Sequence, residues 1–268
     1  MASGRILARV DFERIYRDLV MREFWWEARL GLQAAFYRTY AVPRIAKLLL
    51  ATGEITGRPL KRGYDTGIIM YELIYHGFDH PRGKAMVSLL NRMHRAHDIS
   101  GDDYRYVLGA LMFVPTRVIG RFGRRRLSDV ECRATFLFYR RLGELMNIDG
   151  LPETSEEFEA WFDAYELGFS EAGAALFEAS KSLAVQRTPR PLRRVAAAVN
   201  DVLLETQVRD ALGIRPPGRW LTLAARALLW LGSRTRRRGT DAWYPGRPNP
   251  VYPDGYTLSQ LGPPATAP

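Results

Sequence analysis

The residues best suited to chemistry in this chain are His94 and a nearby polar group formed by Arg62, Asp65 and Thr66. His94 lies in the run Leu89–Arg95, on the apolar face of an expected helix, and the chain has only four histidines. A neutral imidazole is a common metal ligand, and one axial histidine can hold a haem iron. The alternative is a histidine that serves packing or faces solvent.

Arg62, Asp65 and Thr66 are spaced three and four positions apart, so a helix places them on one face. If the helix that begins near Lys61 packs antiparallel to the helix that ends near His94, the three side chains meet the imidazole. A cation, a carboxylate and a hydroxyl would then line a cofactor pocket. The competing interpretation is structural: Arg62 pairs with Asp65, and Thr66 bonds to its own helical turn.

The other histidines offer a second metal hypothesis. His97 follows His94 by three positions, so the two could hold a non-haem metal together. His76 and His80 are four apart, but Gly77 lies between them and interrupts the helix that a two-histidine zinc site requires.

Composition limits the class of protein. Of the 268 residues, 47% are apolar and 25% charged, which indicates a globular chain with ample core. The net charge of +10 favours anionic partners. The single cysteine, Cys132, excludes an intrachain disulfide and favours a reducing, cytoplasmic location, and we expect its thiol to be buried. The sequence has no run near the ~20 apolar residues that a membrane span requires.

Apolar spacing is helical almost throughout, and strand-like alternation is absent. Helices are predicted over Phe12–Tyr40, from Pro43 to near Gly53, over Leu60–Tyr75, from Pro81 to His97, over Tyr104–Phe122 with a kink at Pro115, from a capping box at Ser128 to Met146, from a second capping box at Thr154 through Tyr165, and over Leu192–Leu212 and Arg219–Arg234. The prediction is one all-α domain of about eight to ten helices over residues 1–239, followed by an extended Pro/Gly-rich tail over 240–268.

Two arginine runs, 121–126 and 234–238, are candidate binding surfaces. The second follows an apolar segment, Trp220–Leu231, with a tryptophan near each end. Such a helix could lie on an anionic membrane surface, or it could be a core helix with a solvated end. No nucleic-acid-reading module surrounds either run, so nucleic acid is not an expected partner.

An ordered set of short motifs resembles the family that unites MpaB-type oxygenases with rubber oxygenase (latex clearing protein), and the likeness is closest on the MpaB side. The motifs are Tyr40–Pro43, Thr52–Glu54, Arg62–Thr66, Asn91–His94, Ile99–Tyr104, Arg121–Arg125, Tyr252–Tyr256 and Leu261–Pro263. Each is degenerate alone, whereas the ordered set is fairly specific.

This resemblance implies a helical enzyme that encloses one b-type haem and cleaves C=C bonds with O2. His94 then matches the proximal haem ligand, and Arg62 and Thr66 match polar residues near the haem. Arg62 could instead pair with a haem propionate. Asp65 stands where the rubber oxygenases carry a lysine that can bind the distal face of the iron. With a carboxylate at this position, the distal site is expected to be open or bound to water. A dry pocket would protect the reaction; its candidate lining residues are Met70, Phe113, Phe136 and Phe138.

The sequence therefore predicts a haem b-dependent oxygenase with Arg62, Asp65 and Thr66 as catalytic residues and His94 as metal ligand. Its substrates would be an apolar, isoprenoid-like alkene and O2. The expected location is the cytoplasm, with peripheral membrane contact as an open alternative. The competing hypothesis is a non-catalytic helical protein that binds an anionic membrane surface or nucleic acid through its arginine runs.

Overall fold

The first long apolar run folds into three pieces rather than one helix. In the computed structural model, which describes residues 11–186, 188–236 and 247–263, α2 (Phe12–Asp18) passes into a π-helical turn, η2 (Leu19–Glu23), and α3 (Trp25–Thr39) follows. The chain breaks at Phe24, whose backbone leaves the helical region at φ −122° and whose ring is fully buried. The prediction of one continuous helix was wrong because burial of this aromatic ring outweighs the local helical pattern.

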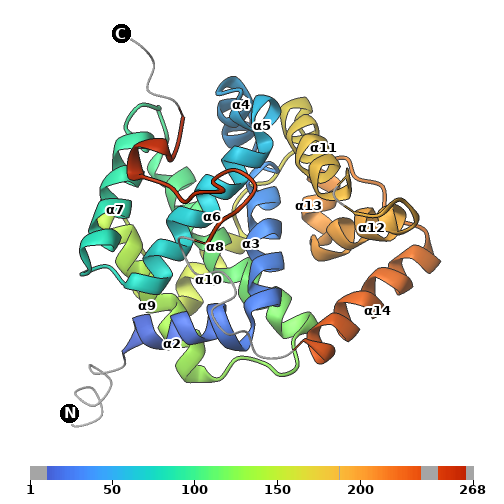
Figure 1. The fold of residues 1–268 in the computed structure, drawn as a ribbon, viewed down its shortest axis with the longest axis horizontal. Coiled ribbons are helices and arrows are strands. Elements are labelled where there is room, and N and C mark those ends of the chain that lie inside the picture. The colour runs from blue at the N-terminus through green and yellow to red at the C-terminus, as the bar shows by residue number, and fades with distance from the viewer. Residues whose placement is uncertain (1–10, 187, 237–246, 264–268) are drawn as a thin grey trace.

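The described residues contain α-helices α2 to α14 and no strand, so the predicted all-α class is confirmed (Figure 1). The remaining elements are α4 (Pro43–Ala51), α5 (Glu54–Gly57), α6 (Pro59–His76), α7 (Pro81–His94), α8 (Gly101–Phe122), α9 (Asp129–Leu145), α10 (Ser155–Asp163), α11 (Glu171–Gln186), η3 (Arg190–Leu192), α12 (Arg193–Leu203), α13 (Thr206–Ala211), α14 (Arg219–Thr235) and η4 (Leu258–Gln260). The helices outnumber the prediction because several are only one or two turns long.

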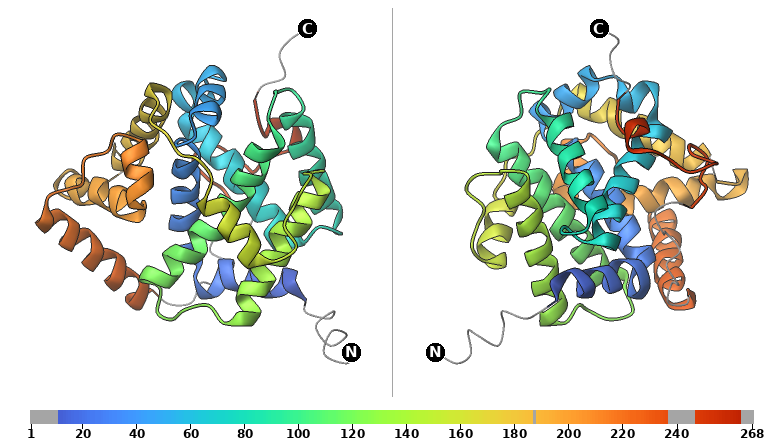
Figure 2. Two further views of the ribbon diagram at one scale, coloured as in Figure 1. Left: turned by 180° about the vertical axis from the view of Figure 1, so that it is seen from behind. Right: turned by 60° about the vertical axis from the view of Figure 1, so that its left-hand side comes forward.

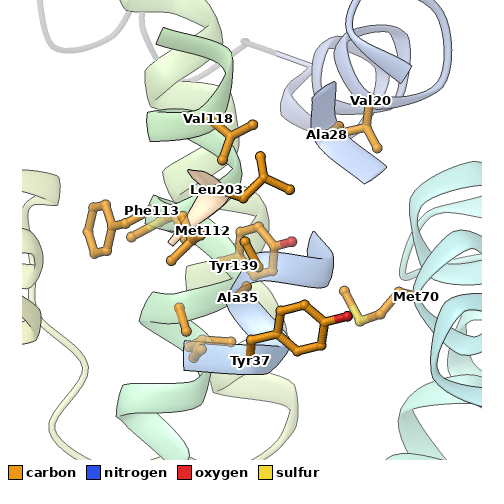
Figure 3. Packing of buried hydrophobic residues seen from close by; sticks show 14 of the residues in the cluster. Val20, Ala28, Ala35, Tyr37, Met70, Met112, Phe113, Val118, Tyr139 and Leu203 are labelled. Carbon is orange, nitrogen blue, oxygen red and sulfur yellow. The ribbon is translucent and has the colours of Figure 1, made fainter. Parts of the chain in front are cut away.

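The paired helices α3 and α8 form the centre of the molecule, and the other helices surround them (Figure 2). Their backbones approach closely where Gly31 meets Pro115: a Cβ atom on Gly31 would lie 2.3 Å from the Pro115 Cα. α8 continues through Pro115 without ending there. Figure 3 shows the resulting core, with Ala35 of α3, Met112 of α8 and Met70 of α6 among its buried side chains.

Local capping signals account for two helix starts. Ser128 forms the predicted capping box with Glu131 at the start of α9. Thr154 caps α10 through the amide of Glu157, but the Glu157 carboxylate returns to the Glu153 amide instead of the Thr154 amide. The second box is therefore only half formed.

Other boundaries differ from the prediction. The helix expected to reach His97 ends at His94, and the helix expected over Leu192–Leu212 is divided into α12 and α13 around Leu204. The short α5 and the long α11 were not predicted. Cys132 was expected to be buried, but it lies exposed near the start of α9.

The C-terminal residues 247–263 run across α6 and α7 (red in Figure 1) and include the short turn η4. The predicted boundary at 239/240 lies outside the described residues. Within the described part of the chain, every helix is too short or too polar to cross a bilayer.

Candidate functional site

His94 is the last residue of α7, and its ring is half-buried. The ring packs against Tyr104 in a T-shaped arrangement, with 5.6 Å between the ring centroids. Its Nδ1 lies 2.7 Å from the Leu90 carbonyl oxygen. A carbonyl only accepts, so Nδ1 carries the hydrogen and Nε2 bears the lone pair of the neutral ring. Burial lowers the pKa of His94, although the bond to Leu90 acts in the opposite direction. The result is a neutral imidazole with one nitrogen free to bind a metal.

Arg62 and Thr66 lie one turn apart in the first half of α6 and contact each other. The guanidinium donates to Thr66 Oγ1, and Thr66 Oγ1 donates to the Arg62 carbonyl at 2.9 Å. The guanidinium also lies over the Phe36 ring, 5.5 Å from its centroid. Burial lowers the pKa of Arg62, whereas the nearby Tyr40 acts in the opposite sense. Thr66 thus bonds to its own turn, as the structural alternative predicted, and it also orients Arg62.

The structure brings Arg62 close enough to His94 for its charge to lower the pKa of the imidazole. The two residues come from adjacent packed helices, α6 and α7. The neutral imidazole of His94 therefore lies near the partly desolvated guanidinium of Arg62. This pairing suits a ligand that carries both a metal ion and an anionic group. The imidazole nitrogen of His94 would bind the metal ion, and the guanidinium of Arg62 would bind the anionic group.

Asp65 has a different environment from Arg62 and Thr66, although it shares their part of α6. Its carboxylate is 3% exposed and accepts from Lys61 at 2.6 Å, from the Tyr252 hydroxyl at 2.5 Å and from the Gly262 amide at 3.0 Å. The predicted ion pair with Arg62 is replaced by one with Lys61. Asp65 thus anchors the C-terminal tail to α6.

Glu72 forms a second anchor two turns further along α6. This fully buried carboxylate accepts from the Tyr256 hydroxyl and from Arg82, whose Nε lies 2.8 Å away. Gly262 packs so closely against α7 that a Cβ atom there would lie 2.6 Å from the sulfur of Met93, the neighbour of His94. The tail therefore ties together the two helices that carry Arg62 and His94.

The predicted pocket-lining residues are core side chains. Met70, Phe113, Phe136 and Phe138 are all buried. The Phe113 ring packs against Phe158 and Phe162, and the Phe138 ring packs against Tyr16 and Phe78. Met70 and Phe136 belong to the same hydrophobic core.

Of the remaining histidines, His76 and His80 make structural contacts. His80 Nδ1 caps α7 by accepting from the Arg82 amide, and its ring stacks on that of His76. His76 Nε2 lies 3.3 Å from the Glu72 carboxylate. His97 is exposed, and no cluster of three metal-binding side chains occurs among residues 11–186, 188–236 and 247–263. A non-haem site built from His94 and His97 would lack a third protein ligand there.

Several residues near the site were not predicted from the sequence. Phe36 of α3 and Tyr40, the residue that follows α3, lie beside Arg62, and Tyr252 and Tyr256 of the tail bind the α6 carboxylates. One signal was available: Asp65 and Glu72 are seven positions apart on the apolar face of a helix. Two carboxylates at such a spacing indicate buried partners.

Comparison with known proteins identifies the class as helical oxygenases. The family profile described as "ER-bound oxygenase mpaB/B'/Rubber oxygenase, catalytic domain" matches residues 24–234. The chain belongs to this family, as its ordered motifs predicted.

Two curated relatives come from Penicillium. ER-bound oxygenase mpaB' of Penicillium brevicompactum is 24% identical over 226 residues, which cover 76% of this chain and 53% of that protein. ER-bound oxygenase mpaB of Penicillium roqueforti (strain FM164) is 26% identical over 221 residues, which cover 74% of each protein. The chain thus spans about half the length of the mpaB' relative.

The solved structure of latex clearing protein in its closed state has the same fold. It superposes with a TM-score of 0.53 at 15% identity, covering 86% of this chain and 68% of that one. This likeness supports the helical architecture alone.

Proposed function

We propose that this protein is a haem b-dependent oxygenase that cleaves a C=C bond of an apolar, isoprenoid-like substrate with O2. In the overall reaction an alkene and one O2 molecule give two carbonyl compounds, so no separate reductant is required. The family membership supports the oxygenase class.

The observation that carries the proposal is the state of His94. Its Nδ1–H is held by the Leu90 carbonyl, so Nε2 is the free donor, and this arrangement is typical of metal-bound histidines. An adjacent cation, Arg62, suits the carboxylate-bearing edge of a haem. His94 would therefore hold the iron of a haem through Nε2, and Arg62 would pair with a haem carboxylate. When bound, haem would supply the O2 chemistry.

The protein's own residues would control access to the haem and the polarity of its surroundings. In this proposal Arg62 either binds a haem propionate or faces the reacting substrate, and Thr66 holds its guanidinium in place. Asp65, a predicted catalytic residue, has its oxygens occupied by Lys61 and the tail. We propose that Asp65 acts as a positioning residue, which keeps α6 and the tail in register beside the site.

An isoprenoid substrate partitions into bilayers, so peripheral membrane contact on the cytoplasmic side is part of the proposal. The relatives' printed name, ER-bound oxygenase, supports work at a membrane.

The absorption spectrum of the protein purified from haem-supplied cells, before and after dithionite, tests the proposal. We expect a Soret band in the wild type and its loss in His94→Ala. The matched control is His97→Ala, three positions away and exposed, which should keep the band. Turnover of isoprenoid alkenes under ¹⁸O2 should place one labelled oxygen in each carbonyl product.

A colourless, fully folded wild type would refute the haem assignment. The carbonyl products are reduced at once to alcohols, so that their oxygens cannot exchange with water. A coloured protein whose reduced products carry label in only one molecule, or in none, would refute cleavage by O2 and leave haem binding intact. Metal analysis of the same sample distinguishes haem iron from a non-haem site on His94 and His97.

The nucleic-acid hypothesis receives no support from the first arginine run. Arg125 pairs with Glu131 at 2.7 Å, and Arg124 donates to the Glu23 carbonyl at 3.3 Å. These bonds tie the run to α9 and η2, so part of its charge is already compensated. Part of the second run, residues 237–238, lies outside the described residues.

A further inference from the structure

Helix α14 lies at the edge of the molecule (lower right in Figure 1). The residues that it buries include the small Ala225 and Ser233, together with Leu229. The opposite face carries large apolar side chains that are 50–75% exposed: Trp220, Leu223, Leu228, Trp230 and Leu231. These are five of the ten large apolar side chains exposed in the described residues.

The exposed residues form one continuous face. Trp220, Leu223, Ala224, Ala227, Leu228 and Leu231 recur at intervals of three and four positions, and all are exposed. This spacing produces an apolar stripe along a helix. The stripe is not covered by other described residues, so α14 is a surface helix rather than a core helix.

Arginines flank the stripe, and no acidic residue accompanies them. Between Asp210 and Asp241 the sequence has no Asp or Glu. Arg219 lies 5.6 Å from the Trp220 ring and Arg234 lies 4.0 Å from the Trp230 ring, so each charge sits beside an apolar anchor. Tryptophan rings and arginine side chains of this kind favour the boundary between headgroups and acyl chains.

We propose that α14 docks this protein onto an anionic lipid bilayer. The helix lies in the plane of the membrane surface, with the Trp220–Leu231 stripe among the acyl chains and the arginines at the phosphate level. This inference is independent of the haem, because vesicle binding requires neither cofactor nor turnover.

Charge favours a bilayer over a second copy of the chain. Two α14 stripes packed face to face would bring the arginines of both copies together with no carboxylate from either helix to compensate them. A surface of anionic headgroups complements the same residues, because each arginine near it is attracted by the negative surface potential.

Co-sedimentation with vesicles tests the proposal. The purified protein is mixed with vesicles of phosphatidylcholine containing 30% phosphatidylglycerol, and with vesicles of phosphatidylcholine alone. We expect binding to the anionic vesicles and a more than ~10-fold weaker partition coefficient for the variant W220Q/L223Q/L231Q. The variant R219Q/R226Q/R234Q should lose about fivefold per arginine on anionic vesicles only.

The matched control is V130Q/L258Q, which removes exposed apolar side chains from other elements and should bind like the wild type. All these positions are exposed, so the variants should fold, and circular dichroism checks that they do. The proposal is overturned if the wild type stays in the supernatant with anionic vesicles, or if the stripe variant binds equally well. It is also overturned if the wild type is a dimer that the stripe variant converts to a monomer.

Discussion

Replacing Asp65 by alanine should loosen the tail from α6 and destabilise the whole domain. The carboxylate is buried and accepts from an ammonium, a hydroxyl and a backbone amide. Its removal leaves the Gly262 amide without its acceptor and Lys61 without its counter-ion. The Tyr252 hydroxyl can still donate to the Gln260 carbonyl at 3.0 Å, and Lys61 keeps bonds to two tail carbonyls at 2.8 and 2.9 Å.

The magnitude follows from these partners. A hydrogen bond to a charged group contributes about 1.5–3 kcal/mol, and each stranded buried donor costs about 1–3 kcal/mol. Because Lys61 retains the two carbonyls, we expect a loss of about 3–5 kcal/mol in the free energy of unfolding, the range found when a buried ion pair is broken. Tyr252→Phe leaves Asp65 with two of its partners and should cost about 1 kcal/mol.

Urea denaturation measures the loss, and limited proteolysis after residue 246 reports release of the tail. The control is Asp102→Ala: Asp102 is 60% exposed and bonds to Arg105 at 2.9 Å at the surface, so its loss should stay below about 1 kcal/mol. If Asp65→Ala costs no more than Asp102→Ala, the tail is not an energetic part of the fold and the positioning role fails.

Two further outcomes test other parts of the structure. The bond from Arg125 lowers the pKa of Glu131 to about 2, below its usual value near 4.5. Glu131 therefore stabilises the fold above pH 4.5, and this contribution is lost as the pH falls toward 2. Because Arg125 is 46% exposed, we expect only about 1 kcal/mol between wild type and Glu131→Gln in urea melts at pH 6, vanishing at pH 2; a constant difference would contradict it. Gly31→Ala places a methyl group against the Pro115 backbone and should lower the free energy of unfolding by about 1–3 kcal/mol. A thermal melt that matches the wild type would show instead that α3 and α8 can move apart to accommodate the methyl group at no cost.

Much of the fold was predictable because its signals are local. The Ser128 capping box, the start of α10 at Thr154 and the extent of α14 depend on residues within a few positions of each other. The missed α11 also had a local signal, since Ser170 accepts from the Gly173 amide at its start.

The failures arise where tertiary burial decides the local conformation. Helical spacing continues through Phe24, yet the chain turns there to bury the ring. At the site, spacing grouped Asp65 with Arg62 and Thr66, but the partners of Asp65 include Tyr252 in the distant tail. A pattern of three and four positions cannot reveal such a partner. The catalytic roles of Arg62, Asp65 and Thr66 stay predictions, and so does the role of His94 as metal ligand.

The tail that joins α6 and α7 also affects how the molecule is completed during folding. Tyr252 follows Asp65 by 187 positions, so both helices leave the ribosome long before this partner is synthesised. Contacts between such distant segments form slowly, because a long loop must close first. The helices that carry His94 and Arg62 should therefore reach their final arrangement only after the C-terminal residues arrive, which makes assembly of the site a late event in biosynthesis.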